Sequence, residues 1–247
     1  GSNAGTGSPT FGSQFNVTGL SLNVSPPAVI PVANGGSLVA WEDENTNLRV
    51  QQLSSTGSLV GAAITIGQGV YAAIHHIEFG TLPNGNILLT WHGRSGASSQ
   101  DALFAQILSP SGAAIGSTFT LLSEGIFGVN ATTIVPIGNN QLLVAAASEP
   151  AALGSDSDVV GRIIDSTGSP SGNAFTINTT TTADQRFVDS TPLANGGAFI
   201  TWQTTEAGFS NSLHRGRFID ANGNPTGNDF LLPNVMDETV RVSVSRE

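Results

Sequence analysis

The stretch NGGAFITW at Asn195–Trp202 decides the fold of this chain, because the sequence contains four versions of it. The other versions are NGGSLVAW at Asn34–Trp41, NGNILLTW at Asn84–Trp91 and GNNQLLVA at Gly138–Ala145. They start at positions 34, 84, 138 and 195, which gives spacings of 50, 54 and 57 residues (84 − 34, 138 − 84, 195 − 138). Spacings of this size indicate a repeat protein in which each unit is one supersecondary element.

Each unit reads as four short β-strands. Its apolar blocks are five to seven residues long, rich in Val, Ile, Leu, Phe and Thr, and bounded by Gly, Asn and Pro, as strands are. Asn-Gly pairs supply the positive φ values of a tight hairpin. In the fourth unit the predicted strands are Phe187–Leu193, Ala198–Trp202, Leu213–Ile219 and Phe230–Leu232.

Four antiparallel strands joined by hairpins form the blade of a β-propeller. A blade cannot bury both faces alone, so successive blades must pack around an axis. We therefore predict an all-β, propeller-like domain over 5–247, after a tag remnant at 1–4, with units at about 18–68, 69–123, 124–180 and 181–233. Segments 12–17 and 239–244 resemble a fourth and a first strand of further units. A β-solenoid and consecutive sandwich domains remain the alternative folds.

The composition restricts the classes of function. Only 11% of the residues are charged, the net charge is −10, and all eight basic residues are Arg. Since no basic run is present, nucleic acid is not an expected partner, and no apolar run is long enough to span a membrane. The absence of Cys excludes disulfides and thiolate metal sites.

The loops between the second and third strands of each unit gather acidic and amide side chains on one predicted face. We take this face as the candidate ligand-binding surface, with residues Glu42, Asp43, Glu44, Asn45, Asp101, Glu149 and Glu206. Clustered oxygen ligands suit calcium, for which Asp156 and Asp158 are the weak candidates. No EF-hand or G-G-x-G-x-D nonapeptide is present, so simple solvation of these loops is the other interpretation.

Two acidic residues share one register on the predicted first strands, which would line the axis. Glu78 and Asp189 each lie six positions before the Asn-Gly turn of their unit, whereas the other units have Ala28 and about Thr132 there. Such a pair is what acid/base cleavage of a glycoside requires. We expect the three Trp residues that end the second strands to pack between blades rather than to stack on sugars.

The stretches at 178–203 and 215–232 resemble the roughly fifty-residue repeats of large bacterial secreted and surface proteins of the hemolysin-type calcium-binding, RTX-adhesin-like kind. The shared pattern is a strand, a turn and NGGAFITW, followed by RGRFIDANGNPTG. The resemblance implies an exported bacterial module for adhesion or display, with a glycan or protein ligand on a surface.

From these observations the sequence favours a non-enzymatic extracellular binding or structural module with no cofactor or with calcium. The alternative is a carbohydrate-binding or glycoside-hydrolysing propeller with its site at the channel mouth, where Glu78 and Asp189 would act as the catalytic pair.

Overall fold

The computed structural model describes residues 26–67, 71–95, 101–123, 132–148, 156–205 and 213–232. These residues form sixteen β-strands in four separate antiparallel sheets, each with four strands in chain order. No helix that could span a membrane occurs in these ranges. The strands are β1 (Ala28–Pro31), β2 (Ser37–Glu42), β3 (Leu48–Leu53), β4 (Leu59–Ile66), β5 (Tyr71–Thr81), β6 (Ile87–Ser95), β7 (Ala102–Leu108), β8 (Ala114–Leu122), β9 (Thr132–Ile137), β10 (Gln141–Ser148), β11 (Asp158–Ile164), β12 (Pro170–Thr176), β13 (Gln185–Pro192), β14 (Ala198–Thr204), β15 (Leu213–Ile219) and β16 (Pro225–Leu231).

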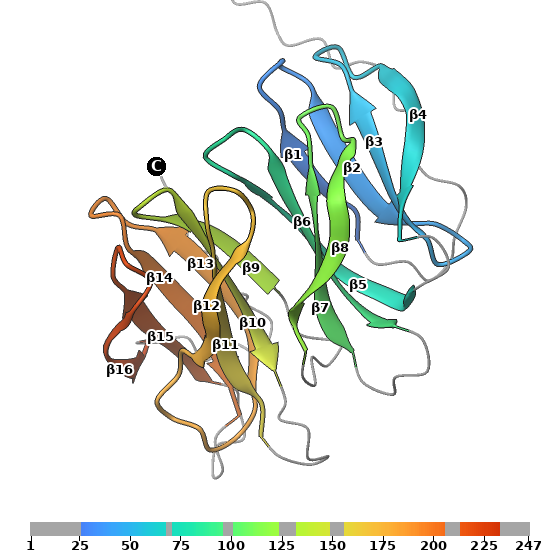
Figure 1. Cartoon of the computed structure of the whole chain (residues 1–247). Coiled ribbons are helices and arrows are strands. Elements are labelled where there is room, and N and C mark those ends of the chain that lie inside the picture. The colour runs from blue at the N-terminus through green and yellow to red at the C-terminus, as the bar shows by residue number, and fades with distance from the viewer. Residues whose placement is uncertain are drawn as a thin grey trace, which may run out of the picture.

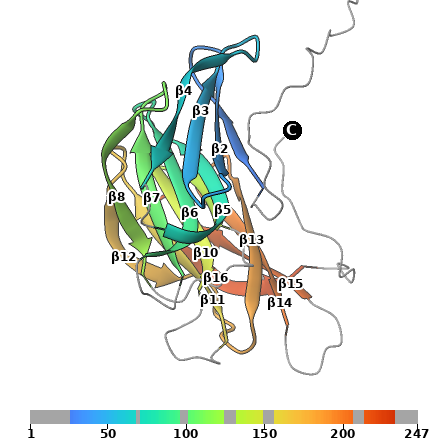
Figure 2. The same cartoon turned by 90° about the vertical axis from the view of Figure 1, so that its right-hand side faces the viewer.

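The four sheets pack against one another as the blades of a propeller do (Figure 1). The first strand of each sheet contacts the first strand of the next, β1 with β5, β5 with β9 and β9 with β13, so these strands are innermost. The fourth strands β8 and β12 lie at the front in Figure 1 and at the left-hand edge in Figure 2. The predicted all-β, propeller-like fold with four-stranded blades is confirmed; the predicted strands at 12–17 and 239–244 lie outside the described residues.

Each pair of adjacent sheets shares one hydrophobic core. Trp91 of sheet β5–β8 packs with Leu38 and Leu48 of sheet β1–β4, and Trp202 packs with Leu143 of sheet β9–β12. Both Trp side chains are buried, as is Trp41. The expectation that the tryptophans serve packing rather than sugar stacking is therefore confirmed for the two that lie in these cores.

The hairpin turns explain most of the repeated sequence. In the first and fourth units the Asn side chain, Asn34 or Asn195, accepts a hydrogen bond from the amide two residues later at 3.0 Å. The third unit is different because its turn, between Ile137 and Gln141, is two residues shorter. Asn139 and Asn140 provide the positive φ values that this tighter turn needs.

The predicted fourth strand of the last unit, Phe230–Leu232, is too short. The observed strand β16 begins at Pro225, because Gly227 adopts a φ of +61° and forms a bulge inside the strand. The predicted first strand at Phe187–Leu193 likewise extends further toward the N-terminus, to Gln185.

Candidate active site

Glu78 and Asp189 occupy the same position on two innermost strands. Glu78 of β5 pairs with Thr90, and Asp189 of β13 pairs with Thr201, in each case next to the buried Trp of the second strand. The strand β9 lies between β5 and β13. The two acids therefore come from alternate blades on either side of β9, as the sequence analysis expected.

A backbone irregularity precedes each of these acids by two residues. His76 has a φ of +47° and Phe187 has a φ of +53°, values that non-glycine residues rarely adopt. At both places the register with the second strand shifts, which marks a β-bulge. Bulges re-aim the side chains that follow them and are common next to active sites. The two bulges therefore change, in the same way in both sheets, the direction in which the side chains of Glu78 and Asp189 point.

The negative charge of Asp189 acts on the carboxyl group of Glu78. Desolvation, followed by the negative charge of Asp189, raises the pKa of Glu78 to about 7 from an ordinary value of 4.5. Glu78 is exposed in the structure, so its carboxyl group is accessible to a substrate although neighbouring atoms partly desolvate it. The Asp189 carboxylate accepts a hydrogen bond from the Ser190 amide at 2.8 Å. One protonated and one ionised carboxyl group is the arrangement used for acid/base chemistry.

The third blade contributes hydroxyl groups instead of an acid. The sequence analysis placed about Thr132 at the register of the acids, but the residue there is Thr133, which pairs with Ala145. The one-residue difference follows from the shorter turn of this unit. The Thr133 hydroxyl lies 2.5 Å from the hydroxyl of Ser190, the neighbour of Asp189. In the first blade the position is Ala28, as predicted.

Histidines adjoin Glu78 on the same two strands. His92 is fully buried, and desolvation together with the charges of His76 and His75 holds its pKa well below the ordinary value, so it is neutral. Its Nε2 lies 2.5 Å from the hydroxyl of Thr132, and its ring is 5.1 Å from that of His76. No group of three or more metal-ligating side chains lies together in the part of the chain that the structure describes.

The first acidic loop is shaped by Asp43. Burial acts to raise its pKa, but hydrogen bonds from the amides of Asn47 and Asn45, with the Asn47 side chain and Arg49, lower it below the ordinary value. Glu42 is buried, whereas Glu44 and Asn45 are exposed. Asp43, Glu44 and Asn45 line a surface cleft of about 300 Å³ with Trp41 and Arg49.

Three of the remaining predicted loop residues form ion pairs or hydrogen bonds with other residues of the chain. Asp101 is buried and forms an ion pair of 2.5 Å with Arg94 across the loop after β6. Asp156 accepts a hydrogen bond from the Ala183 amide, and Asp158 accepts one from Asn178. Calcium binding at Asp156 and Asp158 stays a prediction. Glu149 and Glu206 lie outside the described residues.

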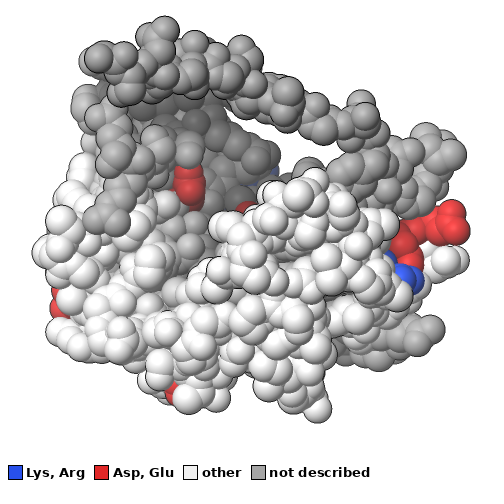
Figure 3. All heavy atoms as spheres, turned by 90° about the horizontal axis from the view of Figure 1, so that it is seen from above, with Lys and Arg blue, Asp and Glu red and all other residues white. Residues whose placement is uncertain are grey.

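The surface seen from above is hollowed near its middle, and acidic atoms are visible in this hollow (Figure 3). The acidic pair on the innermost strands, rather than the outer loops, therefore combines altered protonation of Glu78 with a backbone irregularity before each acid. These are the features by which a catalytic site is recognised.

Neither the protein-family models nor the curated proteins contain a match to this sequence. Solved structures do match. An α-L-arabinanase of Penicillium chrysogenum, complexed with arabinobiose, superposes with a TM-score of 0.63 at 13% identity over 85% of this chain and 66% of its own. An endo-arabinase of Bacteroides thetaiotaomicron gives 0.54 at 12% identity, covering 88% and 82%. An α-L-arabinofuranosidase of Fusarium graminearum gives 0.59 at 11% identity, covering 85% and 66%. The chain thus spans about two thirds of the Penicillium and Fusarium enzymes.

These neighbours correct one interpretation of the sequence. The chain was taken for a non-enzymatic binding or structural module of the adhesion type, but the solved structures it superposes on are enzymes that act on glycans. That interpretation is wrong, and the glycoside-hydrolysing alternative is the better supported one. The resemblance to adhesin repeats and the extracellular location stay predictions.

Proposed function

We propose that the chain is a glycoside hydrolase whose catalytic pair is Glu78 and Asp189. The observation that carries the proposal is the placement of the two carboxyl groups at one register of alternate innermost strands, with the pKa of Glu78 raised to about 7 in part by Asp189. The likeness to arabinan-degrading enzymes supports a glycan substrate.

In this proposal Glu78 is the general acid. Its protonated carboxyl group donates the proton to the glycosidic oxygen as the bond to the anomeric carbon breaks, and the leaving sugar departs as an alcohol. The ionised Asp189 either takes a proton from the attacking water or attacks the anomeric carbon itself. The first route inverts the anomeric configuration and the second retains it, so the configuration of the first-formed product distinguishes the two.

The hydroxyl groups of Thr133 and Ser190, which lie within hydrogen-bond distance of one another on the neighbouring innermost strands, would be partners for sugar hydroxyls. Since the site belongs to innermost strands, substrates would approach it along the axis that these strands line. An exported bacterial enzyme that meets polysaccharide outside the cell fits the acidic, Lys-free composition.

The test is the release of reducing sugar from a panel of plant and bacterial polysaccharides that begins with arabinan. Wild type is compared with Glu78→Gln and Asp189→Asn, which keep shape and remove the ionisable group. A matched control is Asp165→Asn in the turn between β11 and β12, where the amide oxygen can still accept the turn hydrogen bonds. We expect at least a hundred-fold loss in the first two variants and none in the control. Cleavage that survives both substitutions would place the chemistry elsewhere.

A further inference from the structure

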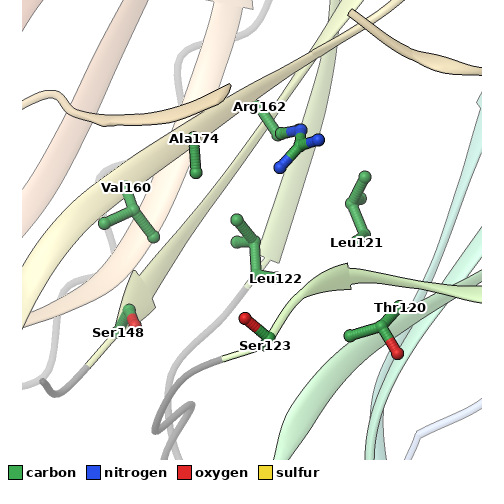
Figure 4. Close-up of a pocket in the computed structure, with 8 residues that line it drawn as sticks. All are labelled: Thr120, Leu121, Leu122, Ser123, Ser148, Val160, Arg162 and Ala174. Atoms are coloured by element: carbon green, nitrogen blue, oxygen red, sulfur yellow. The ribbon is translucent and has the colours of Figure 1, made fainter. Parts of the chain in front are cut away.

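Arg162 lies in a cleft between the second and third sheets. The cleft has a volume of about 320 Å³ and is lined by side chains of β8, β10, β11 and β12 and by the residue after β8, namely Thr120, Leu121, Leu122, Ser123, Ser148, Val160, Arg162 and Ala174. Figure 4 shows the guanidinium group of Arg162 extended over this cleft toward the strand that carries Leu121 and Leu122. The lining comes mainly from outer strands, so the cleft is distinct from the pair on the innermost strands.

The internal repeat shows what a side chain at this position ordinarily does. The counterparts of Arg162 on the third strands of the other sheets are Gln51, Gln106 and Arg217. Gln51 donates hydrogen bonds to the carbonyls of Val60 and Gly61, at the glycine bulge of its own fourth strand. This role is structural, since it satisfies carbonyl groups at the bulge.

The other two counterparts behave in the same way. Gln106 donates to the carbonyls of Ile115 and Gly116, and Arg217 donates to the carbonyl of Gly227. All of these glycines have positive φ values, as does Gly172 at the corresponding bulge of the third sheet. The third sheet thus has the same glycine bulge, and the Arg162 side chain is long enough to donate hydrogen bonds to its carbonyl groups, as Arg217 does in the fourth sheet.

Arg162 nevertheless makes none of these bonds. Within the part of the chain that the structure describes, it has no hydrogen bond and no ion pair, and its Nε is buried without a partner. By contrast Arg49, Arg94, Arg186 and Arg215 are all paired with aspartates. Arg162 is half-buried, and the Nε of Arg49 is also buried without a partner, so what distinguishes Arg162 is that its guanidinium has no acceptor at all among the described residues and is free to take one from a ligand.

We propose that this cleft binds a sugar carboxylate, that is, a uronic acid residue of a glycan. The planar guanidinium fits a carboxylate with two parallel hydrogen bonds. The hydroxyl group of Ser123 points into this space and suits a sugar hydroxyl, and Leu122, Val160 and Ala174 suit the apolar face of the ring. Binding here is independent of the hydrolysis proposed for Glu78 and Asp189, so either can fail alone.

The test measures binding of glucuronate and galacturonate oligosaccharides to the whole chain by calorimetry, with neutral glucose oligosaccharides and sodium acetate as comparisons. We expect the uronates to bind and the neutral sugars and acetate to bind at least ten-fold more weakly. Arg162→Gln should lose at least ten-fold in uronate affinity. Because Gln is the residue at this position in two other sheets, the melting temperature of this variant should not fall.

Two further variants sharpen the result. Arg162→Lys keeps the charge but not the planar fork, and should fall between wild type and Arg162→Gln. Arg94→Gln removes an arginine that is already paired with Asp101, and uronate binding should be unchanged. Equal uronate affinity in wild type and Arg162→Gln would overturn the proposal. Acetate binding as tight as uronate binding would also overturn it, because the cleft would then recognise a simple anion and not a sugar.

Discussion

At the scale of single residues, the protonation of Glu78 controls the proposed reaction. Its pKa is raised to about 7 by desolvation and by the charge of Asp189. A general acid must carry its proton, so the protonated form that donates is fully present well below pH 7 and is lost as the pH rises through this value.

We therefore expect kcat/KM on a polysaccharide substrate to fall as the pH rises through about 7. The fall should be one log unit per pH unit, and Asp189→Asn should shift the midpoint downward because the neighbouring charge is removed. The measurement is a pH profile from pH 4 to 9 with stability checked at each point. A flat profile across pH 7 would show that Glu78 does not supply the proton.

The same shift affects the free energy of unfolding. In the folded state Glu78 binds its proton more tightly than in the unfolded chain, where the ordinary pKa is 4.5. Its contribution to stability is complete below about pH 4.5 and is lost as the pH rises to about 7. Glu78→Gln removes this pH dependence, so urea unfolding of the variant should respond less to pH between 4.5 and 7.

Asp229 is a structural residue that the sequence analysis did not single out. Its buried carboxylate on β16 accepts hydrogen bonds from the amides of Thr179 and Thr180 and pairs with Arg215 at 2.7 Å. Burial acts to raise its pKa, but these hydrogen bonds lower it below 3.8. The stabilisation is present above pH 3.8 and is lost as the pH falls through the lower, folded-state value.

We expect Asp229→Asn to lower the free energy of unfolding at pH 7 by about 2 kcal/mol, the usual scale of hydrogen bonds to a charged group. Urea unfolding at pH 7 and at pH 3 measures this. The difference between variant and wild type should shrink at pH 3. A difference that is the same at both pH values would mean that the charge of Asp229 is unimportant.

At the scale of elements, the hairpin between the third and fourth strands joins neighbouring sheets. Gly168, in the turn between β11 and β12, has a φ of +93°, and a Cβ there would lie 2.4 Å from the Cδ1 of Ile107 on the preceding sheet. Gly172, four residues later, has a φ of +70° but open space around it. An alanine at Gly172 would therefore meet only the strain of the left-handed backbone, whereas an alanine at Gly168 would meet this strain and a steric clash with Ile107.

Gly172→Ala should lower the free energy of unfolding by about 1 kcal/mol, from the left-handed backbone alone. Gly168→Ala should cost about 2 to 3 kcal/mol, because the overpacking against Ile107 is added. Chemical denaturation of both variants tests the difference. Equal losses would show that the contact between turn and preceding sheet is not tight.

Much of the element structure follows from the sequence because its signals are local. Asn-Gly turns, apolar blocks and the shared register of Glu78 and Asp189 can all be found by aligning the units. The bulges at His76 and Phe187 could not be predicted, since a positive φ is uncommon for any non-glycine residue and especially for a bulky one such as Phe. Tertiary packing imposes that conformation.

Two other features were missed for different reasons. The true start of β16 was missed because the predicted strand began only at Phe230, after the bulge that Gly227 forms within the strand. The unusual state of Arg162 depends on hydrogen bonds that its counterparts make and it does not, so only the structure reveals it. An alignment of the third strands in the sequence would have shown that Arg162 is equivalent to Gln51 and Gln106. It would not have shown that Arg162 lacks the hydrogen bonds that these two residues make.

At the scale of the whole molecule, one face of the fourth sheet has aromatic side chains that are exposed in the described structure. Three hydrophobic cores join the four described sheets, and in sheet β5–β8 the residues Leu88 and Ile107 are buried in one of them. The corresponding side chains of the fourth sheet are Phe199 and Phe218. With Phe230 they form a cluster of ring contacts, yet Phe218 is 44% and Phe230 is 40% exposed in the described structure.

The sequence prediction that segments 12–17 and 239–244 supply further strands remains open, and this face is where such strands would pack. If it is covered in solution, Phe218→Ser should lower the free energy of unfolding by about 2 to 3 kcal/mol. Ile115→Ser, at the similarly exposed Ile115 on β8, should change it by less than about 1 kcal/mol. Near-neutral effects of both substitutions would contradict the prediction.

The most direct test of the central claim is the dependence of Glu78→Gln on the leaving group. A general acid is needed for a sugar alkoxide, which leaves poorly, but hardly for a nitrophenolate, which leaves without a proton. The account predicts that Glu78→Gln loses at least a hundred-fold in kcat/KM on the polysaccharide that wild type cleaves, and less than ten-fold on the matching nitrophenyl glycoside. Equal losses on both substrates would contradict the assignment of Glu78 as the acid of this site.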